Sequence, residues 1–276
     1  MKIGVVAPSN RIMPDLPERV AELSARLYGD DQLEIWFHPQ CFLTAGHFAG
    51  ADAARAQAFL DVANDESFDA VWFGRGGYGS FRLVEPVLAN LGPVAKGKTY
   101  LGYSDAGAML GALYGAGVGR IAHGPMPADL NRTGGEAAIR RALAFLVDGD
   151  PAALEPTVSA GHPVAAFNIT ILSHLIGTPF LPDLTGHVLM LEEVAEAMYR
   201  IDRALGQITS TPAIRRAAGI MLGRCSDITA NDPDFGMGEE EVARYWCQRS
   251  GIPYLGRADI GHDVDNKVVP FGGWLV

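Results

Sequence analysis

The sequence predicts an α/β fold with two domains: a larger N-terminal domain built on a parallel sheet, and a smaller C-terminal α/β domain. Short apolar runs, such as residues 2–9 and 68–74, alternate with amphipathic segments through the first half of the chain. This alternation is typical of a parallel sheet covered by helices on both faces. A stretch rich in proline, glycine and alanine then interrupts the pattern. We therefore expect domains at residues 1–148 and 164–276, joined by a linker at 149–163.

The individual elements follow from the same periodicities. Apolar runs that end in turn residues predict strands at 2–9, 33–39, 68–74, 99–104, 186–194 and 217–225, and a hairpin at 266–276. Helical periodicity predicts helices at 17–29, 52–65, 80–91, 105–117, 196–208 and 239–251. Functional loops of parallel sheets follow the carboxyl ends of the strands. The loops 74–79 and 102–106 are therefore the first candidates for a site.

The composition indicates a cytoplasmic globular protein. The 276 residues are 48% hydrophobic and 20% charged, and the formal net charge of −10 argues against nucleic acid or an anionic membrane as a partner. The first apolar run is too short for a signal peptide, and no stretch approaches the ~18 residues of a membrane helix. The widely spaced Cys41, Cys225 and Cys247 predict free thiols. No metal-ligand spacing such as H-E-x-x-H occurs, so we expect no metal and no other cofactor.

The stretch Gly74–Gly79 matches the G-x-G-x-x-G pattern of dinucleotide-binding loops. That fingerprint belongs after the first strand, with an acidic residue about 20 positions further on. Here the loop follows the third predicted strand, and the later position falls within Lys96–Lys98. Gly79 is followed directly by Ser80 and Phe81 and not by K-[ST], so this loop is not a Walker phosphate loop. We interpret the loop as one that presents backbone N–H groups for another purpose.

The second loop has the outline of a nucleophile elbow. An apolar strand is followed by Gly102, by Ser104 at the tip and by the small Ala106. In such a turn the N–H of Asp105 points to where an oxyanion forms. Ser104 would also serve as the N-cap of the next helix, and the local sequence alone favours this capping role.

A nucleophilic serine requires a histidine base and an acid that orients it. His123, near the functional edge of the sheet, and His262, in a flexible turn, are candidates. Glu192 and Glu193 end an apolar strand, where a carboxylate is well placed to orient an imidazole. The remaining histidines are His38, His47, His162, His174 and His187. Spacing does not choose among these residues.

Four motifs occur in order along the chain: GRGGYG at 74–79, LGYSD at 101–105, LEEVAEAMYRIDRAL at 191–205 and GHDVDNKVVPFG at 261–272. Together they resemble the LD-carboxypeptidases of serine peptidase family S66, and the resemblance covers nearly the whole chain. It implies a catalytic triad of Ser104, Glu192 and His262. It also implies a Rossmann-like N-terminal domain, a smaller C-terminal domain that carries part of the active site, and a homodimer.

The resemblance further implies a cytoplasmic serine carboxypeptidase that hydrolyses the LD-peptide bond of murein tetrapeptides, releasing terminal D-alanine during cell-wall recycling. The amides of Gly77 and Asp105 would form its oxyanion hole. Arg75 is a candidate for binding the substrate's carboxylate, or equally for a structural ion pair. One alternative is a microcin-C-immunity-type hydrolase of aminoacyl-adenylate amides. A catalytically silent binding protein is another, although the presence of all three triad residue types argues against it.

Overall fold

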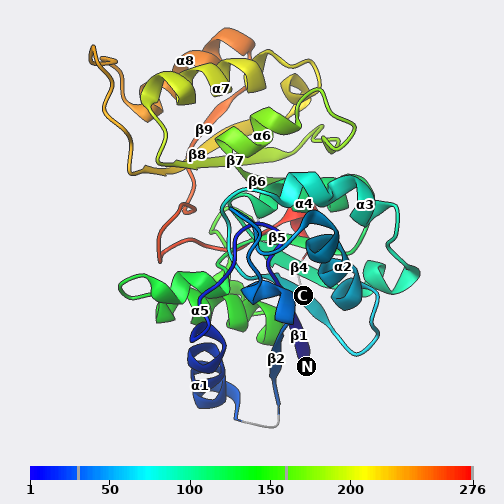
Figure 1. Cartoon of the computed structure of the whole chain (residues 1–276). Coiled ribbons are helices and arrows are strands. Elements are labelled where there is room, and N and C mark those ends of the chain that lie inside the picture. The colour runs from blue at the N-terminus through cyan, green and yellow to red at the C-terminus, as the bar shows by residue number, and fades with distance from the viewer. Residues whose placement is uncertain (30–31, 159–160, 275–276) are drawn as a thin grey trace.

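The structure is a computed structural model that describes residues 1–29, 32–158 and 161–274. Its described strands form two sheets, one above the other in Figure 1. The first sheet contains, in spatial order, β2 (Glu34–Phe37), β1 (Lys2–Val6), β3 (Ala70–Phe73), β4 (Thr99–Gly102), β5 (Arg120–His123) and β10 (Val269–Pro270). The second contains β6 (Val164–Asn168), β7 (Val188–Val194), β8 (Gly219–Ser226) and β9 (Tyr254–Arg257).

Helices cover both faces of the first sheet, as its alternating side chains require. These helices are α1 (Leu16–Tyr28), α2 (Asp52–Ala63), α3 (Val84–Leu88), α4 (Ala106–Gly115) and α5 (Glu136–Leu143). Along β3, Trp72 packs with α1 and α5, whereas Val71 and Phe73 pack with α2, α3 and α4. The predicted parallel α/β core is therefore confirmed.

The order β2–β1–β3–β4–β5 is that of flavodoxin-like doubly wound sheets. In this order the chain direction across the sheet reverses between β1 and β3, and ligands bind outside the carboxyl ends of the strands at such a reversal. The glycine-rich loop follows β3 and the Ser104 loop follows β4, so both lie at this edge.

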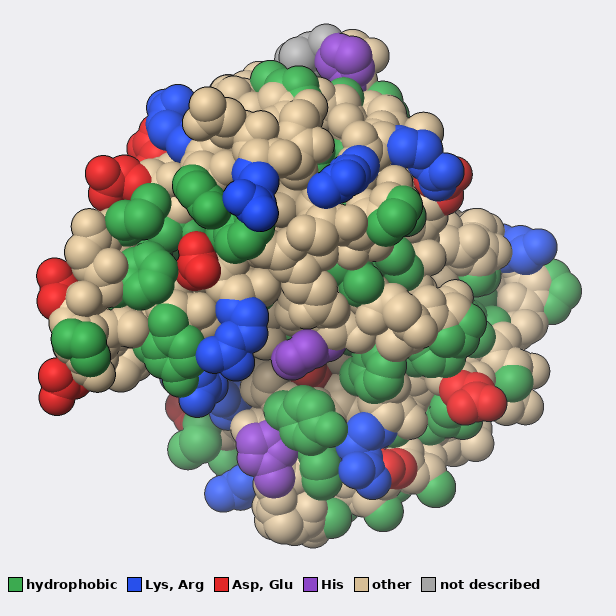
Figure 2. Space-filling view, turned by 90° about the horizontal axis from the view of Figure 1, so that it is seen from above, with side chains coloured by type: hydrophobic (Ala, Val, Ile, Leu, Met, Phe, Trp, Pro, Cys, Tyr) green, Lys and Arg blue, Asp and Glu red, His purple; other side chains and the backbone are tan. Residues whose placement is uncertain are grey.

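The second sheet carries α6 (Ile169–Leu175), α7 (Met198–Ser210) and α8 (Glu239–Ser250), at the top of Figure 1. The core is continuous between the two sheets. Helix α4 packs on α6 at Gly111, where an added Cβ would lie 3.1 Å from Leu175 and from Phe167. Seen from above, basic and acidic side chains are interspersed over this face (Figure 2). Nowhere in the described ranges is a helix both long and apolar enough to span a bilayer.

Several elements differ from the prediction. The strands β5, β6 and β9 and the helices α5 and α6 were not predicted. The predicted terminal hairpin is wrong, because Val269 and Pro270 pair antiparallel with His123 and Ala122 of the first sheet. The segment after β9 thus returns from the second sheet to the first (Figure 1). The predicted linker 149–163 includes residues 159–160, which lie outside the described residues.

Candidate active site

Ser104 has a left-handed backbone conformation in the turn between β4 and α4. Its φ is 61°, which costs an L-residue about 1–2 kcal/mol and is the kind of strain found in a nucleophile elbow. Helix α4 begins at Ala106, with Asp105 at the N-cap position. Within the described chain Ser104 Oγ makes no hydrogen bond to the helix backbone, so the capping interpretation is wrong.

The glycine-rich loop lies against the Ser104 hydroxyl. An ideal Cβ on Gly76 would lie 2.7 Å from Ser104 Oγ. Gly77 has a φ of 119°, a conformation that favours glycine, and a Cβ there would lie 2.6 Å from the Asn10 side chain. The close approach of the Ser104 and Asn10 side chains therefore explains why both positions are glycine. A bound nucleotide is not needed to explain them.

Asp105 joins three loops at the carboxyl edge of the first sheet. Its carboxylate, on a residue only 3% exposed, accepts hydrogen bonds from the Ser9 hydroxyl and from the Ser80 N–H, the latter at 2.8 Å. The Ser80 hydroxyl donates to the Asp105 carbonyl at 2.5 Å. Because Ser9 follows β1 and Ser80 follows β3, this network holds the turn that carries Ser104. Sequence reasoning missed both serines, since small polar residues follow strands in many loops without such a role.

The predicted oxyanion donors are the backbone N–H groups of Gly77 and Asp105. Gly77 lines the same cavity as Ser104, whereas the Asp105 side chain is buried beneath the turn. Neither backbone N–H donates a hydrogen bond to another backbone group in the described chain. Both amides are therefore available as donors.

His262, which lines the same cavity as Ser104, forms a buried pair with Glu192. Glu192 lies on β7 with no exposed surface, and its Oε2 lies 2.5 Å from Nδ1 of the largely buried His262. Burial disfavours the imidazolium, but the adjacent Glu192 carboxylate outweighs it, and the pKa of His262 is raised above its ordinary value. Nε2 of His262 has no partner among the described residues. No hydrogen bond within the described chain therefore competes for this nitrogen, on a residue that lines the cavity.

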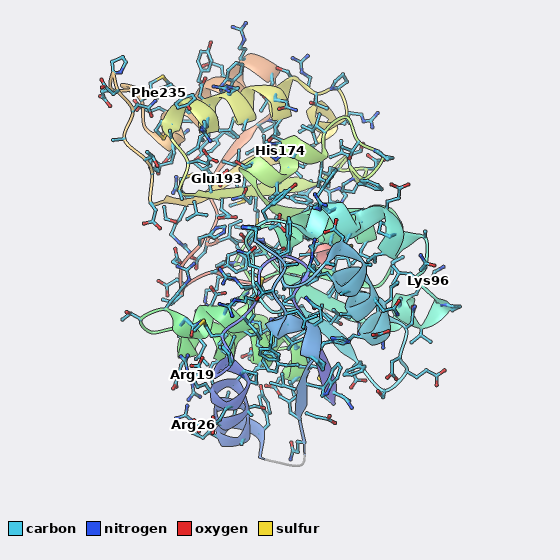
Figure 3. The ribbon with its side chains drawn as sticks, viewed as in Figure 1. Arg19, Arg26, Lys96, His174, Glu193 and Phe235 are labelled. Atoms are coloured by element: carbon cyan, nitrogen blue, oxygen red, sulfur yellow. The ribbon has the colours of Figure 1, made fainter. Side chains whose placement is uncertain are left out.

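The competing candidates have other partners. Glu193, labelled in Figure 3, accepts hydrogen bonds from Asn168 Nδ2 at 2.5 Å and from the Thr170 hydroxyl at 2.7 Å, so it holds the start of α6. His123 is fully enclosed, and burial lowers its pKa to about 4. Its Nε2 lies 3.2 Å from Asn266 Oδ1, which also accepts the Gly261 N–H. His123 thus supports the His262 turn from beneath.

A cavity of about 370 Å³ brings these groups together. Its lining includes Ser104, His262, Gly76, Gly77, Arg75 and Arg132. Arg75 donates to the Arg11 carbonyl at 3.2 Å and has no carboxylate partner in the described chain. Sequence reasoning missed Arg132. The one signal in the sequence is that Asp129 precedes it by three residues, a spacing that brings the two side chains together on one helical turn.

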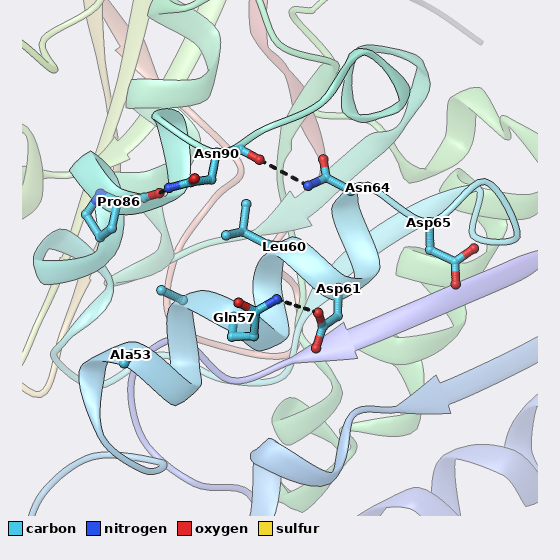
Figure 4. Close-up of a pocket in the computed structure, with 9 residues that line it drawn as sticks. Ala53, Gln57, Leu60, Asp61, Asn64, Asp65, Pro86 and Asn90 are labelled. Atoms are coloured by element: carbon cyan, nitrogen blue, oxygen red, sulfur yellow. Dashed lines mark hydrogen bonds between the residues drawn. The ribbon is translucent and has the colours of Figure 1, made fainter.

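A larger hollow between α2 and α3 contains none of these groups (Figure 4). Its polar side chains bond to neighbouring groups: Gln57 Nε2 donates to Asp61 at 2.7 Å, and Asn64 Nδ2 to the Asn90 carbonyl at 3.1 Å. Among the described residues, no three His, Cys, Asp or Glu side chains lie together as a metal site.

Comparison with known proteins gives a consistent family. The LD-carboxypeptidase N-terminal domain model matches residues 3–124, and the C-terminal domain model matches residues 163–276. A protein of Synechocystis sp. with a provisional carboxypeptidase name is 32% identical, over 98% of this chain and 89% of its own. The murein tetrapeptide carboxypeptidase of Pseudomonas aeruginosa is 24% identical, over 98% of this chain and 91% of its own.

Solved structures show the same fold. The muramoyltetrapeptide carboxypeptidase from Oxalobacter formigenes superposes with a TM-score of 0.79 at 26% identity, covering 98% of this chain and 93% of that one. The microcin C7 self-immunity protein MccF, in complex with aspartyl sulfamoyl adenosine, has a TM-score of 0.77 at 16% identity, covering 98% and 91%. This second similarity concerns the fold alone. From the two family models and the Synechocystis relative, the chain belongs to the LD-carboxypeptidase family of peptidases.

Proposed function

We propose that this protein is a serine carboxypeptidase that hydrolyses the LD-peptide bond of murein tetrapeptides and releases the terminal D-alanine. One observation carries the proposal: Ser104, with its strained φ, and His262, bonded to the buried Glu192, line the same cavity. The names of the Pseudomonas and Oxalobacter relatives supply the substrate class.

In the proposed reaction, His262 Nε2 takes the proton of Ser104 as Oγ attacks the scissile carbonyl carbon. The carbonyl oxygen becomes an oxyanion, which accepts hydrogen bonds from the Gly77 and Asp105 amides. Glu192 holds the Nδ1 proton and stabilises the imidazolium. His262 then protonates the amine of the departing D-alanine, which leaves an acyl-Ser104 ester.

Water completes the cycle. His262 accepts a proton from water as the oxygen attacks the ester carbonyl, and the same amides stabilise the second oxyanion. Collapse returns the proton to Ser104 Oγ and releases the shortened peptide as an acid. Arg75, at the cavity wall without a carboxylate partner, would attract the carboxylate of the incoming substrate.

The other expectations are part of the same proposal: action in the cytoplasm on recycled muropeptides, as a homodimer. The alternative is hydrolysis of an aminoacyl-adenylate amide by the same groups. The fold shared with MccF makes this worth including in the same assay.

The proposal is tested by mass spectrometry of a disaccharide tetrapeptide, of its D-to-L-alanine analogue and of aspartyl sulfamoyl adenosine after incubation with the protein. We expect loss of one alanine from the D-substrate only, and no loss with Ser104→Ala. Ser67→Ala is the matched control. Ser67 is exposed in the loop before β3, at the end of the strand opposite to the glycine-rich loop. Cleavage of the adenosine compound alone would favour the alternative. No cleavage of any of the three would contradict both.

A further inference from the structure

The cavity beside Ser104 contains a second guanidinium group, that of Arg132, for which the proposed reaction has given no role. Its Nε donates to Asp129 Oδ1 at 3.0 Å. Side-chain hydrogen bonds of Arg132 to other described residues are confined to this Nε. The two Nη groups of a side chain that is 41% exposed therefore remain available at the cavity.

Asp129 is itself held in place by other groups. Its Oδ1 accepts the Tyr103 hydroxyl at 2.7 Å, and its Oδ2 accepts the Met126 N–H at 2.9 Å. Tyr103 immediately precedes Ser104, so the carboxylate connects the guanidinium of Arg132 to the turn that carries the nucleophile. An arginine held in this way through Nε loses little further freedom when its Nη edge binds a ligand.

The segment that carries Arg132 is anchored on both sides. Arg19, on α1 (Figure 3), donates to Asn131 Oδ1 at 2.7 Å and to the Leu130 carbonyl at 3.1 Å. The Ala128 N–H donates to the Gly74 carbonyl at 3.0 Å, which ties the same segment to the glycine-rich loop. The position of Arg132 relative to Ser104 is thus set by the fold and not by a mobile loop.

A carboxypeptidase must distinguish a free terminal carboxylate from a continuing peptide, and the planar fork of an arginine matches a carboxylate with two parallel hydrogen bonds. We infer that Arg132, oriented by Asp129, binds the terminal carboxylate of the substrate and determines the preference for a free C-terminus. This inference rests on the proposed function. Arg75, which has no carboxylate partner in the described chain, then attracts the substrate's carboxylate by its positive charge. Arg132 fixes the orientation of that carboxylate through two parallel hydrogen bonds.

The test compares a tetrapeptide that ends in D-alanine with the same peptide ending in D-alaninamide. The quantity measured is the ratio of kcat/KM for the acid to kcat/KM for the amide, in the wild type and in Arg132→Met, Arg132→Lys and Arg140→Met. A misfolded variant loses activity toward both peptides, so the ratio isolates carboxylate recognition. Arg140 is an exposed arginine on α5 whose ion pair is with Glu136, at 3.7 Å, and it serves as the control.

We expect Arg132→Met to lower the acid-to-amide ratio roughly 10- to 100-fold, the value of hydrogen bonds to a charged group. Arg132→Lys keeps the charge but loses the fork, so its ratio should lie between those of the wild type and Arg132→Met. Arg140→Met should keep the wild-type ratio. An unchanged ratio in both Arg132 variants, with activity toward acid and amide falling together, would overturn the assignment and leave the proposed function standing. If the wild type cleaved neither peptide, the proposed function would fall and the assignment with it.

Discussion

A methyl group on Gly76 would lie 2.7 Å from Oγ and 2.8 Å from Cβ of Ser104. Ser104 lies in a tight turn with a positive φ, and the hydrogen bonds of Asp105 hold this turn in place. Ser104 therefore has little freedom to move away from Gly76. The glycine at this position therefore keeps the space in front of the hydroxyl open.

Gly76→Ala should consequently lower kcat about 100-fold, as expected when a reacting group is displaced by about 1 Å. Gly97→Ala is the matched control, since a Cβ there meets no atom within 4 Å. Steady-state kinetics on the tetrapeptide would measure the change, and circular dichroism would check that both variants fold. Equal activity of the two variants would show that Ser104 does not depend on the space in front of Gly76.

The strands β1 to β4 of the first sheet were predictable because they and the helices between them have local periodicity. Residues 2–9, 68–74 and 99–104 all contain the observed strands β1, β3 and β4. By contrast, β10 consists of two residues that pair with β5 over a long sequence separation. So short a strand has no periodicity of its own, and it was misassigned to a hairpin.

In the candidate active site, too, some features could be predicted from the sequence and others could not. Residues in loops after strands could be identified from position, and the motif resemblance selected Glu192 and His262 from several acids and histidines. The contacts that hold them could not be predicted. Asp105 meets Ser9 across 96 positions, and His262 meets Glu192 across 70. Such contacts arise when strands distant in sequence end at one edge, and no local pattern encodes them.

The His262–Glu192 pair predicts a pH profile. Because the pKa of His262 is raised, and the proposed base is the neutral imidazole, kcat/KM should rise with pH through a pKa above 6.5. Glu192→Gln removes the charge that raises this pKa, while burial continues to lower it. The acidic limb should therefore move to lower pH, and kcat should fall roughly 10³- to 10⁴-fold, as for a triad acid. An acidic limb at the same pH in both proteins would contradict the assignment of His262 as the titrating base.

The same pair affects stability with a defined sign. A histidine whose pKa is raised on folding stabilises the protein fully below its unfolded pKa, about 6.5, and this contribution is lost as the pH rises through the folded pKa. Urea unfolding of the wild type and His262→Gln should thus show a larger difference in unfolding free energy below pH 6.5 than in alkaline solution. A difference that grew toward alkaline pH would mean that the pKa of His262 is lowered in the fold.

Arg141 binds the turn that carries His262, the proposed base. On α5, against the first sheet, its Nη1 donates to the Val264 carbonyl at 2.7 Å and to the Asn266 carbonyl at 3.0 Å, within the turn that carries His262. Arg224 on β8 holds the same turn through Asp263, with one hydrogen bond of 2.9 Å, so the turn is fastened to both sheets. Loss of one fastening should let His262 shift relative to Ser104.

Arg141→Met should accordingly lower kcat roughly 10- to 100-fold with a smaller change in KM, because positioning of the base matters for proton transfer more than for binding. Arg140→Met, at the neighbouring and exposed position, should keep wild-type kcat. Arg141→Lys retains a positively charged donor group and should recover part of the lost rate. If Arg141→Met lost activity only in proportion to a fall in its folded fraction, measured by urea unfolding, Arg141 would contribute to stability and not to the position of His262.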